Sequence, residues 1–242
     1  MKQKYPIVIL PGWMLGAYRF EKLAQEFEKY GHKTYTVDFP GFERGEKIVR
    51  PWFLNDYVDF LERYLEQKKL KKVIFVCHSF GGRVALKLVT NYPKQVVALI
   101  ISGTPGFTPI PQSRLKTFVW LAKLGGMFFS VPILKLVKNE ARKLYYWLAG
   151  AKEYYHADGF MRETFKYIVA ENLESSMKKI TLPTLLLWGN LDTIVPVRIA
   201  EKMQTTIQNS KLIVIPDTGH MVPAREPQKF VKETENYLSK IS

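Results

Sequence analysis

The chain has 242 residues, 47% of them hydrophobic and 24% charged, a composition that fits a globular protein with a full core and excludes extensive disorder. The single cysteine, Cys77, excludes an intrachain disulfide and a cysteine-rich metal site. Lys and Arg outnumber Asp and Glu by 36 to 22, giving a net charge of +14, but the basic residues are scattered. This scatter indicates a solvated basic surface, so we expect no nucleic-acid partner.

The first part of the chain alternates short apolar runs with longer segments of helical periodicity, which is typical of βαβ units and a parallel sheet. Segment 17–30 repeats apolar side chains at helical spacing, and Pro51 opens a second helix. A third helix, 80–91, follows a strand directly. The strands expected in this part are 5–10, 34–37, 73–77 and 96–101.

This alternation stops between residues 106 and 179, where only helix-like segments rich in aromatic residues and lysine occur. It then resumes, and the expected elements are the strands 184–188 and 212–215 and the helices 197–207 and 226–238. A helical insertion between two strands of one sheet is the simplest explanation. We therefore predict an α/β core domain made of 1–105 and 180–242, with 106–179 as a helical cap or lid.

The segment CHSFGG, residues 77–82, lies between an expected strand and an expected helix. A serine on such a sharp turn has its hydroxyl exposed, and the helix N-terminus that follows favours developing negative charge. The general pattern is G-x-S-x-G, and Cys77 replaces its first glycine. Ser79 is therefore the candidate nucleophile, although a serine here can also be a buried turn residue.

A serine hydroxyl needs a base, and the base needs an orienting acid. Asp192 follows the strand expected at 184–188, and His220 follows the strand expected at 212–215, so both lie at the sheet edge that carries Ser79. The alternatives are a core histidine at 220, a helix-capping aspartate at 192, and Asp217 as the acid. Asp217 is less favourable because it lies only three residues before His220.

The remaining histidines and Cys77 receive no catalytic role. His78 neighbours the serine but points away from it at a sharp turn, so we expect it to form part of the structure or the pocket wall. Cys77 is interpreted as a packed strand residue, and His32 and His156 have no motif around them. No His, Cys and carboxylate cluster has metal-ligand spacing, and no phosphate-binding glycine loop is present, so we predict neither metal nor cofactor.

These segments together resemble the α/β-hydrolase superfamily over nearly the whole chain. The landmarks, in family order, are LPGWMLG, DFPGF, HSFGGRVAL, LLLWGNLDTIVP and PDTGHMVPAREP. The resemblance implies a mostly parallel sheet of about six strands flanked by helices, and a Ser79–His220–Asp192 triad. It also implies an oxyanion hole formed by the backbone N–H groups of Trp13 and Phe80. Many relatives have His-Gly where this chain has Pro11 and Gly12, a change that keeps the backbone donor.

The expected substrate is a small or medium-chain carboxylic ester, cleaved by a cytoplasmic carboxylesterase that is a monomer or homodimer. The residues expected to contact it are Trp13, Met14, His78, Trp120, Trp147 and Met221. The aromatic residues of 106–179 either line an acyl pocket under the cap or form the cap's own core. We expect no stable membrane insertion, although the basic insertion allows weak contact with anionic lipid.

Other functions on the same scaffold stay open at this point. HSFGGR, with Arg83 after the glycine pair, also resembles the menaquinone-pathway lyase branch of the superfamily. Lactone hydrolysis, carbon–carbon bond hydrolysis and non-catalytic ligand binding are further alternatives. An aspartate-dependent dehalogenase or epoxide hydrolase is disfavoured because the candidate nucleophile is a serine.

Overall fold

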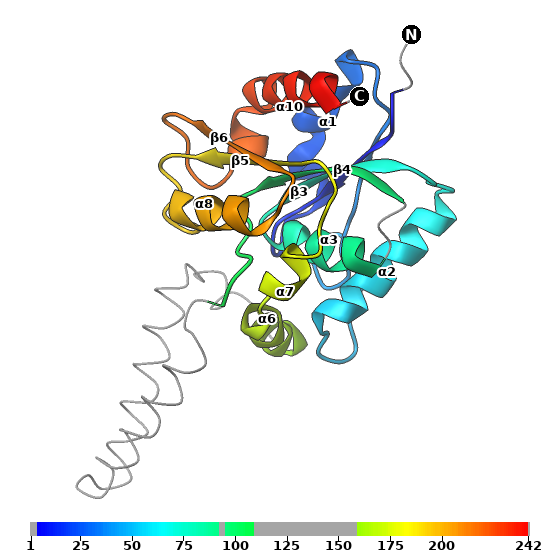
Figure 1. Cartoon of the computed structure of the whole chain (residues 1–242). Coiled ribbons are helices and arrows are strands. Elements are labelled where there is room, and N and C mark those ends of the chain that lie inside the picture. Colours follow the sequence, from blue (N-terminus) through cyan, green and yellow to red (C-terminus); the bar gives the residue numbers. More distant parts are fainter. Residues whose placement is uncertain (1–3, 92–94, 109–158, 242) are drawn as a thin grey trace, which may run out of the picture.

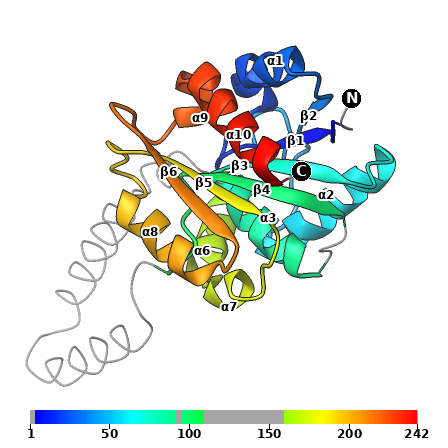
Figure 2. The same cartoon turned by 45° about the horizontal axis from the view of Figure 1, so that its top comes forward.

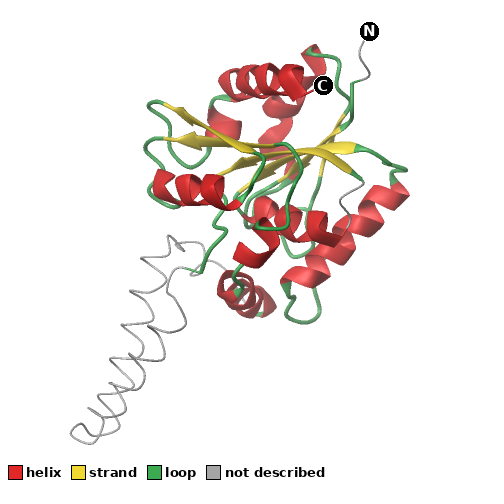
Figure 3. Cartoon of the chain, viewed as in Figure 1, coloured by secondary structure: helices red, strands yellow, loops and turns green. Residues whose placement is uncertain are grey.

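The computed structural model describes residues 4–91, 95–108 and 159–241. Within these ranges six strands form one sheet in the order β2-β1-β3-β4-β5-β6, and each neighbouring pair is parallel (Figures 1 and 3). The strands are β1 (Ile7–Leu10), β2 (Thr34–Thr36), β3 (Val73–His78), β4 (Val96–Ser102), β5 (Thr184–Gly189) and β6 (Ser210–Ile215). The α/β sheet of six strands expected from the sequence is confirmed.

Helices cover both faces of this sheet (Figures 1 and 2). On one face lie η1 (Ala17–Phe20), α1 (Glu21–Lys29), α9 (Val222–Arg225) and α10 (Pro227–Ile241), and on the other lie α2 (Leu54–Gln67), α3 (Phe80–Asn91) and α8 (Val197–Thr206). Two further helices, α6 (Phe160–Ala170) and α7 (Glu174–Met177), lie beyond α3 on this second face. In the part of the chain that the structure describes, no helix is long and apolar enough to cross a membrane.

The strand side chains divide the core into two layers. In β1 the side chains of Val8 and Leu10 pack with α2 and α3, whereas those of Ile7 and Ile9 pack with α1 and α10. All four are at most 1% exposed, as expected for a central strand that is covered on both faces. Burying each such side chain stabilises the fold by roughly 1.5–3 kcal/mol.

Two expected helices differ in detail from the structure. The segment expected at 17–30 is η1 followed by α1, because Phe20 leaves helical geometry with φ −112° and ψ 9° while its side chain is fully buried. The closing helix expected at 226–238 is α10, and the short helix α9 precedes it without having been predicted. Pro227 lacks a backbone N–H and therefore begins a new helix more readily than it continues one.

The strand order places the loops after β1 and β3 next to each other at the carboxyl edge of the sheet. After β1 the chain crosses to β2 at one side, and it then returns to form β3 on the other side of β1. Ligands of open parallel sheets bind at such a reversal of strand order. The loops that follow β1 and β3 therefore face the same crevice outside the sheet.

Candidate active site

Ser79 forms the turn between β3 and α3. Its φ of 49° is a left-handed conformation that costs a non-glycine residue about 1–2 kcal/mol and that clusters at functional sites. The Ser79 amide donates a hydrogen bond of 2.8 Å to the carbonyl of Ser102 at the end of β4. The residue stays partly exposed. The strained turn thus presents a hydroxyl at the carboxyl edge of the sheet.

The two glycines after this turn allow α3 to begin close against the sheet. A Cβ on Gly81 would lie 2.2 Å from the carbonyl oxygen of Leu10, and one on Gly82 would lie 2.0 Å from Oγ1 of Thr104. The Gly81 amide also donates to the Pro11 carbonyl over 2.9 Å. Any larger side chain at either glycine would push the helix, and with it Ser79, away from β1 and β4.

Cys77 replaces the first glycine of the serine motif and packs inside the core. It pairs with Leu10 and Ile101 on the neighbouring strands and is 1% exposed. Burial raises the pKa of the Cys77 thiol well above its ordinary value, so the thiol stays protonated. The side chain therefore contributes packing beneath α3 and has no access to a substrate.

His220 and Asp192 lie on the loops after β6 and β5 and contact each other. Nδ1 of His220 is 2.8 Å from Oδ2 of Asp192. The other carboxylate oxygen accepts the amides of Ile194 at 2.9 Å and Val195 at 2.8 Å, which holds the carboxylate in place. Because an ionised carboxylate only accepts, the pair keeps a proton on Nδ1 and leaves Nε2 of neutral His220 as an acceptor.

The backbone joins the two loops that carry this pair. The Leu191 amide donates to the Thr218 carbonyl over 2.8 Å, and a Cβ on Gly189 would lie 2.2 Å from that same oxygen. Asp217, the rival acid, is exposed and has a φ of 57°. The carboxylate that contacts His220 is therefore that of Asp192.

Gly103 brings the end of β4 against the His220 ring. It has a φ of 59°, and a Cβ there would lie 2.7 Å from Cε1 of His220. The preceding residue, Ser102, accepts the amide of Ser79, so the serine turn and the His220 ring both contact the same short stretch of backbone. Within the described residues no hydrogen bond joins the Ser79 hydroxyl to His220, and catalytic hydrogen bonds are often long before substrate binds.

The backbone N–H groups of Trp13 and Phe80 donate no hydrogen bond to any described residue. The side-chain rings of Trp13 and Phe80 lie 5.5 Å apart, centre to centre, in an edge-to-face contact. The Trp13 ring also contacts Phe42 and Phe165, each at 5.1 Å. The two candidate oxyanion donors therefore belong to residues that lie side by side in space and whose rings are part of one aromatic cluster.

The other residues expected to contact substrate occupy different surroundings. His78 is 2% exposed, with its ring 4.8 Å from that of His220, and burial together with the nearby His220 holds the pKa of His78 well below its usual range. Met14 is partly buried against the core beneath α2 and α3, and Met221 against the core beneath α1 and α10. Trp120 and Trp147 lie outside the described residues.

Two acidic residues that the sequence analysis did not single out hold the loop after β1. Asp38 accepts the amide of Ala17 over 2.7 Å, and Glu43 accepts the amide of Gly16 over 3.0 Å. Glu43 also pairs with Arg19 at 2.5 Å, and that hydrogen bond lowers the pKa of Glu43 despite partial burial. The only feature of the sequence that could have indicated these two residues is their place in the loop DFPGFE after β2.

Among the residues with described positions, no cluster of His, Cys, Asp and Glu is arranged to hold a metal.

The order of the parallel strands, with a serine turn after β3 and a histidine–aspartate pair after β5 and β6, defines an α/β hydrolase. The resemblance found in the sequence is confirmed. The chain belongs to the serine aminopeptidase S33 family, whose model matches residues 2–228.

Three known proteins match the chain over most of their length. The chain is 24% identical to the uncharacterised hydrolase YugF of Bacillus subtilis (strain 168), with 96% of this chain and 89% of YugF covered. It is 27% identical to a pimeloyl-(acyl-carrier protein) methyl ester esterase of Wigglesworthia glossinidia brevipalpis, with 98% and 94% covered. The structure of an esterase from Exiguobacterium antarcticum matches with a TM-score of 0.73 at 21% identity, over 99% of this chain and 93% of the esterase.

Proposed function

We propose that the chain is a serine hydrolase that cleaves carboxylic esters of small to medium acyl chains. Ser79 is the nucleophile, His220 the base and Asp192 the acid that orients it. The observation that carries this proposal is the His220–Asp192 pair, in which Nδ1 of His220 donates to the carboxylate. Nε2 is then available to accept a proton from the serine on the strained turn. A serine hydroxyl becomes a useful nucleophile only with such an oriented base.

In the proposed reaction, Oγ of Ser79 attacks the ester carbonyl carbon while Nε2 of His220 takes the hydroxyl proton. The tetrahedral intermediate then collapses, the bond to the leaving oxygen breaks, and His220 gives its proton to the departing alcohol. Water attacks the resulting acyl-enzyme, with His220 again taking a proton. The carboxylic acid is released, and the proton returns to Ser79.

The N–H groups of Trp13 and Phe80 would stabilise the negative oxygen of each tetrahedral intermediate. Both are without partners among the described residues, and Phe80 is the first residue of α3, where the helix dipole adds positive potential. Losing one donor of this kind costs ~10²–10³ in kcat. The hydrogen bond from Gly81 to Pro11 ties the two donor segments together.

The substrate class is supported by the relatives and by the aromatic cluster. Two of the three relatives described above are named as esterases. Trp13, Phe42, Phe80 and Phe165 are 3–8% exposed and form an apolar cluster next to the candidate oxyanion donors. Such surroundings suit an acyl chain better than a charged group.

We also propose that 106–179 acts as a cap on the core. Its two ends leave and rejoin the core at one place, because the Leu173 amide donates to the Gly106 carbonyl over 3.1 Å. The helix α6, which belongs to the carboxyl-terminal part of 106–179, contacts Trp13 through Phe165. A segment anchored in this way can cover the crevice above Ser79.

The test is hydrolysis of p-nitrophenyl esters from acetate to palmitate by the wild-type protein and by Ser79→Ala. We expect turnover with a preferred chain length, and a loss in kcat of ~10⁴–10⁶ on removing the nucleophile. Stoichiometric labelling of Ser79 by a fluorophosphonate probe is the matching expectation. Labelling without turnover of any ester would point to lactones, carbon–carbon bonds or lyase chemistry, and neither labelling nor turnover would point to ligand binding.

A second substrate class is favoured by the charge of 106–179, which carries twelve Lys and Arg against six Asp and Glu. This net charge of +6 would attract an acyl ester that is itself anionic or is presented on an anionic carrier. The name of the Wigglesworthia relative describes an ester on an acyl-carrier protein. A KM that rises with salt for a carboxylated ester, but not for a neutral ester of equal length, would support this class.

A further inference from the structure

The loop after β1, residues 11–17, carries the candidate oxyanion donor Trp13 and contains a strained turn. The Leu15 amide donates to the Gly12 carbonyl over 3.1 Å, which closes the turn around Trp13 and Met14. Met14 has a φ of 57°, a left-handed conformation that persists in a non-glycine residue only where the surrounding structure enforces it. The contacts that enforce this turn therefore also place the N–H group of Trp13.

The first end of this loop is fixed beside the serine motif. The Gly81 amide of α3 donates to the Pro11 carbonyl over 2.9 Å. Gly12 lies against the buried ring of His78, because a Cβ on Gly12 would be 2.9 Å from Cδ2 of that ring. The start of the loop thus has a fixed place next to Ser79, and the orientation of the turn depends on how the other end is held.

Two carboxylates hold this other end. The Ala17 amide donates to Oδ1 of Asp38 over 2.7 Å, and the Gly16 amide donates to Oε2 of Glu43 over 3.0 Å. Gly16 is buried, so its N–H group needs a partner within the protein. Arg19 pairs with the second oxygen of Glu43 over 2.5 Å and keeps that carboxylate in place. Because hydrogen bonds to ionised acceptors are roughly twice as strong as neutral ones, the two carboxylates hold these amides firmly.

The loop that supplies both carboxylates follows β2 and is closed by its own main chain. The Phe42 amide donates to the Phe39 carbonyl over 3.0 Å, and the Gly45 amide donates to the Phe42 carbonyl over 2.9 Å. Phe42, which directly precedes Glu43, also contacts the Trp13 ring at 5.1 Å. The loop after β2 therefore supports the loop after β1 through two carboxylates and one aromatic ring.

We propose that Asp38 and Glu43 are positioning residues that hold the Trp13 N–H group where it can bind the oxyanion of each tetrahedral intermediate. The proposal rests on the ester hydrolysis proposed above. Each carboxylate acts through a main-chain amide, three or four residues after Trp13. A donor that binds the oxyanion acts in the transition state and not in the bound ester, so its displacement lowers kcat and leaves KM nearly unchanged.

The experiment compares Asp38→Ala and Glu43→Ala with Asp56→Ala. Asp56 is a matched control at the start of α2, because its carboxylate accepts the Phe53 amide over 2.7 Å and pairs with Arg50 over 2.5 Å. For p-nitrophenyl acetate and octanoate alike, we expect each of the first two variants to lower kcat by ~10–10², with KM within about threefold of wild type. Asp56→Ala should keep the wild-type kcat.

Conservative variants separate the hydrogen bonds to the loop from a general loss of structure. Asp38→Asn and Glu43→Gln keep an acceptor oxygen for the amide, and they should recover kcat to within about threefold of wild type. Titration of Ser79 with a fluorophosphonate corrects each rate for the fraction of active sites. A boronic acid that mimics the tetrahedral intermediate should bind the alanine variants more weakly by the same factor as the fall in kcat/KM.

Three results would overturn the proposal: wild-type kcat in both alanine variants, an equal fall in Asp56→Ala, or a raised KM with unchanged kcat. If the wild-type protein hydrolyses no ester, the proposed reaction fails, and amide exchange then tests the two carboxylates without substrate. Asp38→Ala and Glu43→Ala should speed exchange about tenfold in 13–17 but not in β3 or β4, since local opening differs between regions. Unchanged exchange in 13–17, or equal acceleration everywhere, would refute the positioning role.

Discussion

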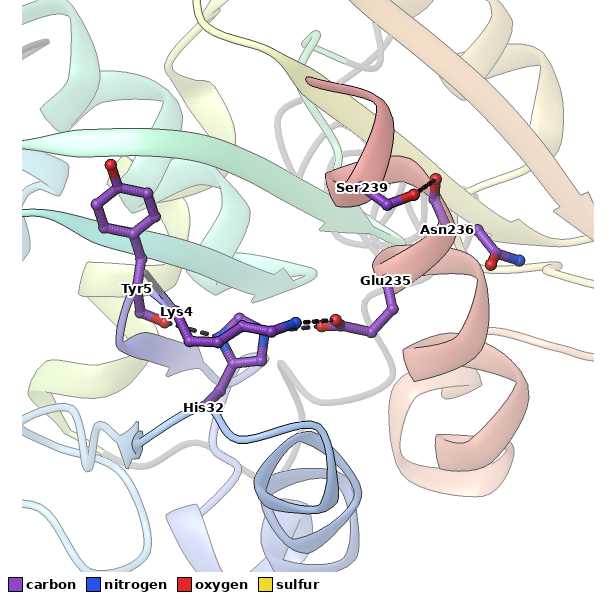
Figure 4. A network of polar contacts seen from close by, with 6 residues as sticks. All are labelled: Lys4, Tyr5, His32, Glu235, Asn236 and Ser239. Carbon is purple, nitrogen blue, oxygen red and sulfur yellow. Dashed lines mark hydrogen bonds and ion pairs between the residues drawn. The ribbon is translucent and has the colours of Figure 1, made fainter. Parts of the chain in front are cut away.

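Two histidine–carboxylate pairs lie at opposite edges of the sheet, and only one has the geometry of a catalytic pair. His220 and Asp192 occupy the carboxyl edge, whereas His32, before β2, and Glu235, in α10, occupy the amino edge (Figure 4). The nitrogen–oxygen distance is 2.8 Å in both pairs. The two pairs differ at the second ring nitrogen of each histidine.

In the pair at the amino edge, both ring nitrogens of His32 have partners. Nδ1 is 2.7 Å from the carbonyl oxygen of Tyr5 and must donate to it, while Nε2 faces the Glu235 carboxylate. Lys4 adds a second partner, 2.7 Å from the other oxygen of Glu235. Both ring nitrogens of His32 thus have polar partners, so neither is free to take a proton from a hydroxyl.

Ser239 lies near the His32–Glu235 pair, but its hydroxyl donates to a main-chain carbonyl instead of to the histidine. His32, Glu235 and Ser239 all line a cavity of about 530 Å³ at the amino edge. The Ser239 hydroxyl donates to the carbonyl of Asn236, in its own helix, over 3.0 Å (Figure 4). A serine, a histidine and a carboxylate near one cavity are thus insufficient. A serine nucleophile also requires a base with a free ring nitrogen and a hydroxyl exposed on a turn, the arrangement that we propose for His220 and Ser79.

Replacing each carboxylate by its amide should produce the largest difference between the two pairs. Asp192→Asn should lower kcat by ~10⁴, because the amide favours the tautomer of His220 with its proton on Nε2. Glu235→Gln should leave kcat within about twofold and lower the free energy of unfolding by about 1–3 kcal/mol, through loss of a partly buried ionic acceptor. Ester kinetics and urea unfolding of both variants test this, and a loss of kcat in Glu235→Gln would contradict it.

The sequence allowed the carboxyl-edge pair to be predicted but not the amino-edge pair. Each residue of the former follows a short apolar strand, and parallel strands end at one edge, so strand order alone brings Asp192 and His220 together. His32 and Glu235 are 203 positions apart and lack a motif, and their contact depends on how α10 packs beside α1. The buried guanidinium of Arg83 donates to the main-chain carbonyls of Pro105, Ile168 and Glu171. These partners could not be predicted either, because every residue type has a main-chain carbonyl.

Gly103, which lies against His220, and Gly31, which precedes His32, allow a test with a smaller expected effect. Both have positive φ, 59° at Gly103 and 85° at Gly31, but a Cβ on Gly103 would press on His220 whereas one on Gly31 would meet no atom within 4 Å. Backbone strain should therefore destabilise both alanine variants by about 1–2 kcal/mol. Only Gly103→Ala should also lower kcat, by ~10–10², because it displaces the base. Equal kcat in the two variants would show that His220 tolerates the methyl group.

A smaller effect is the part of the pH dependence of stability that the amino-edge pair contributes. Burial alone would raise the pKa of Glu235, but hydrogen bonds and charge from His32 and Lys4 outweigh it and hold that pKa below its ordinary value. The unfolded chain then binds a proton more readily than the folded one, so stability rises with pH across this range. The contribution is complete above the unfolded pKa of about 4.3 and is lost as the pH falls through the folded pKa.

Urea unfolding of wild type and Glu235→Gln between pH 6 and pH 3 measures this contribution as the difference between the two curves. The difference should shrink as the pH falls. Glu174→Gln is the control, because Glu174 pairs with Lys178 at 2.9 Å on the surface, where water and salt screen the interaction. Its difference from wild type should be smaller and should vanish in high salt, whereas that of Glu235→Gln should persist. A Glu235→Gln difference that does not change with pH would show that the carboxylate charge is not what holds α10 at the amino edge.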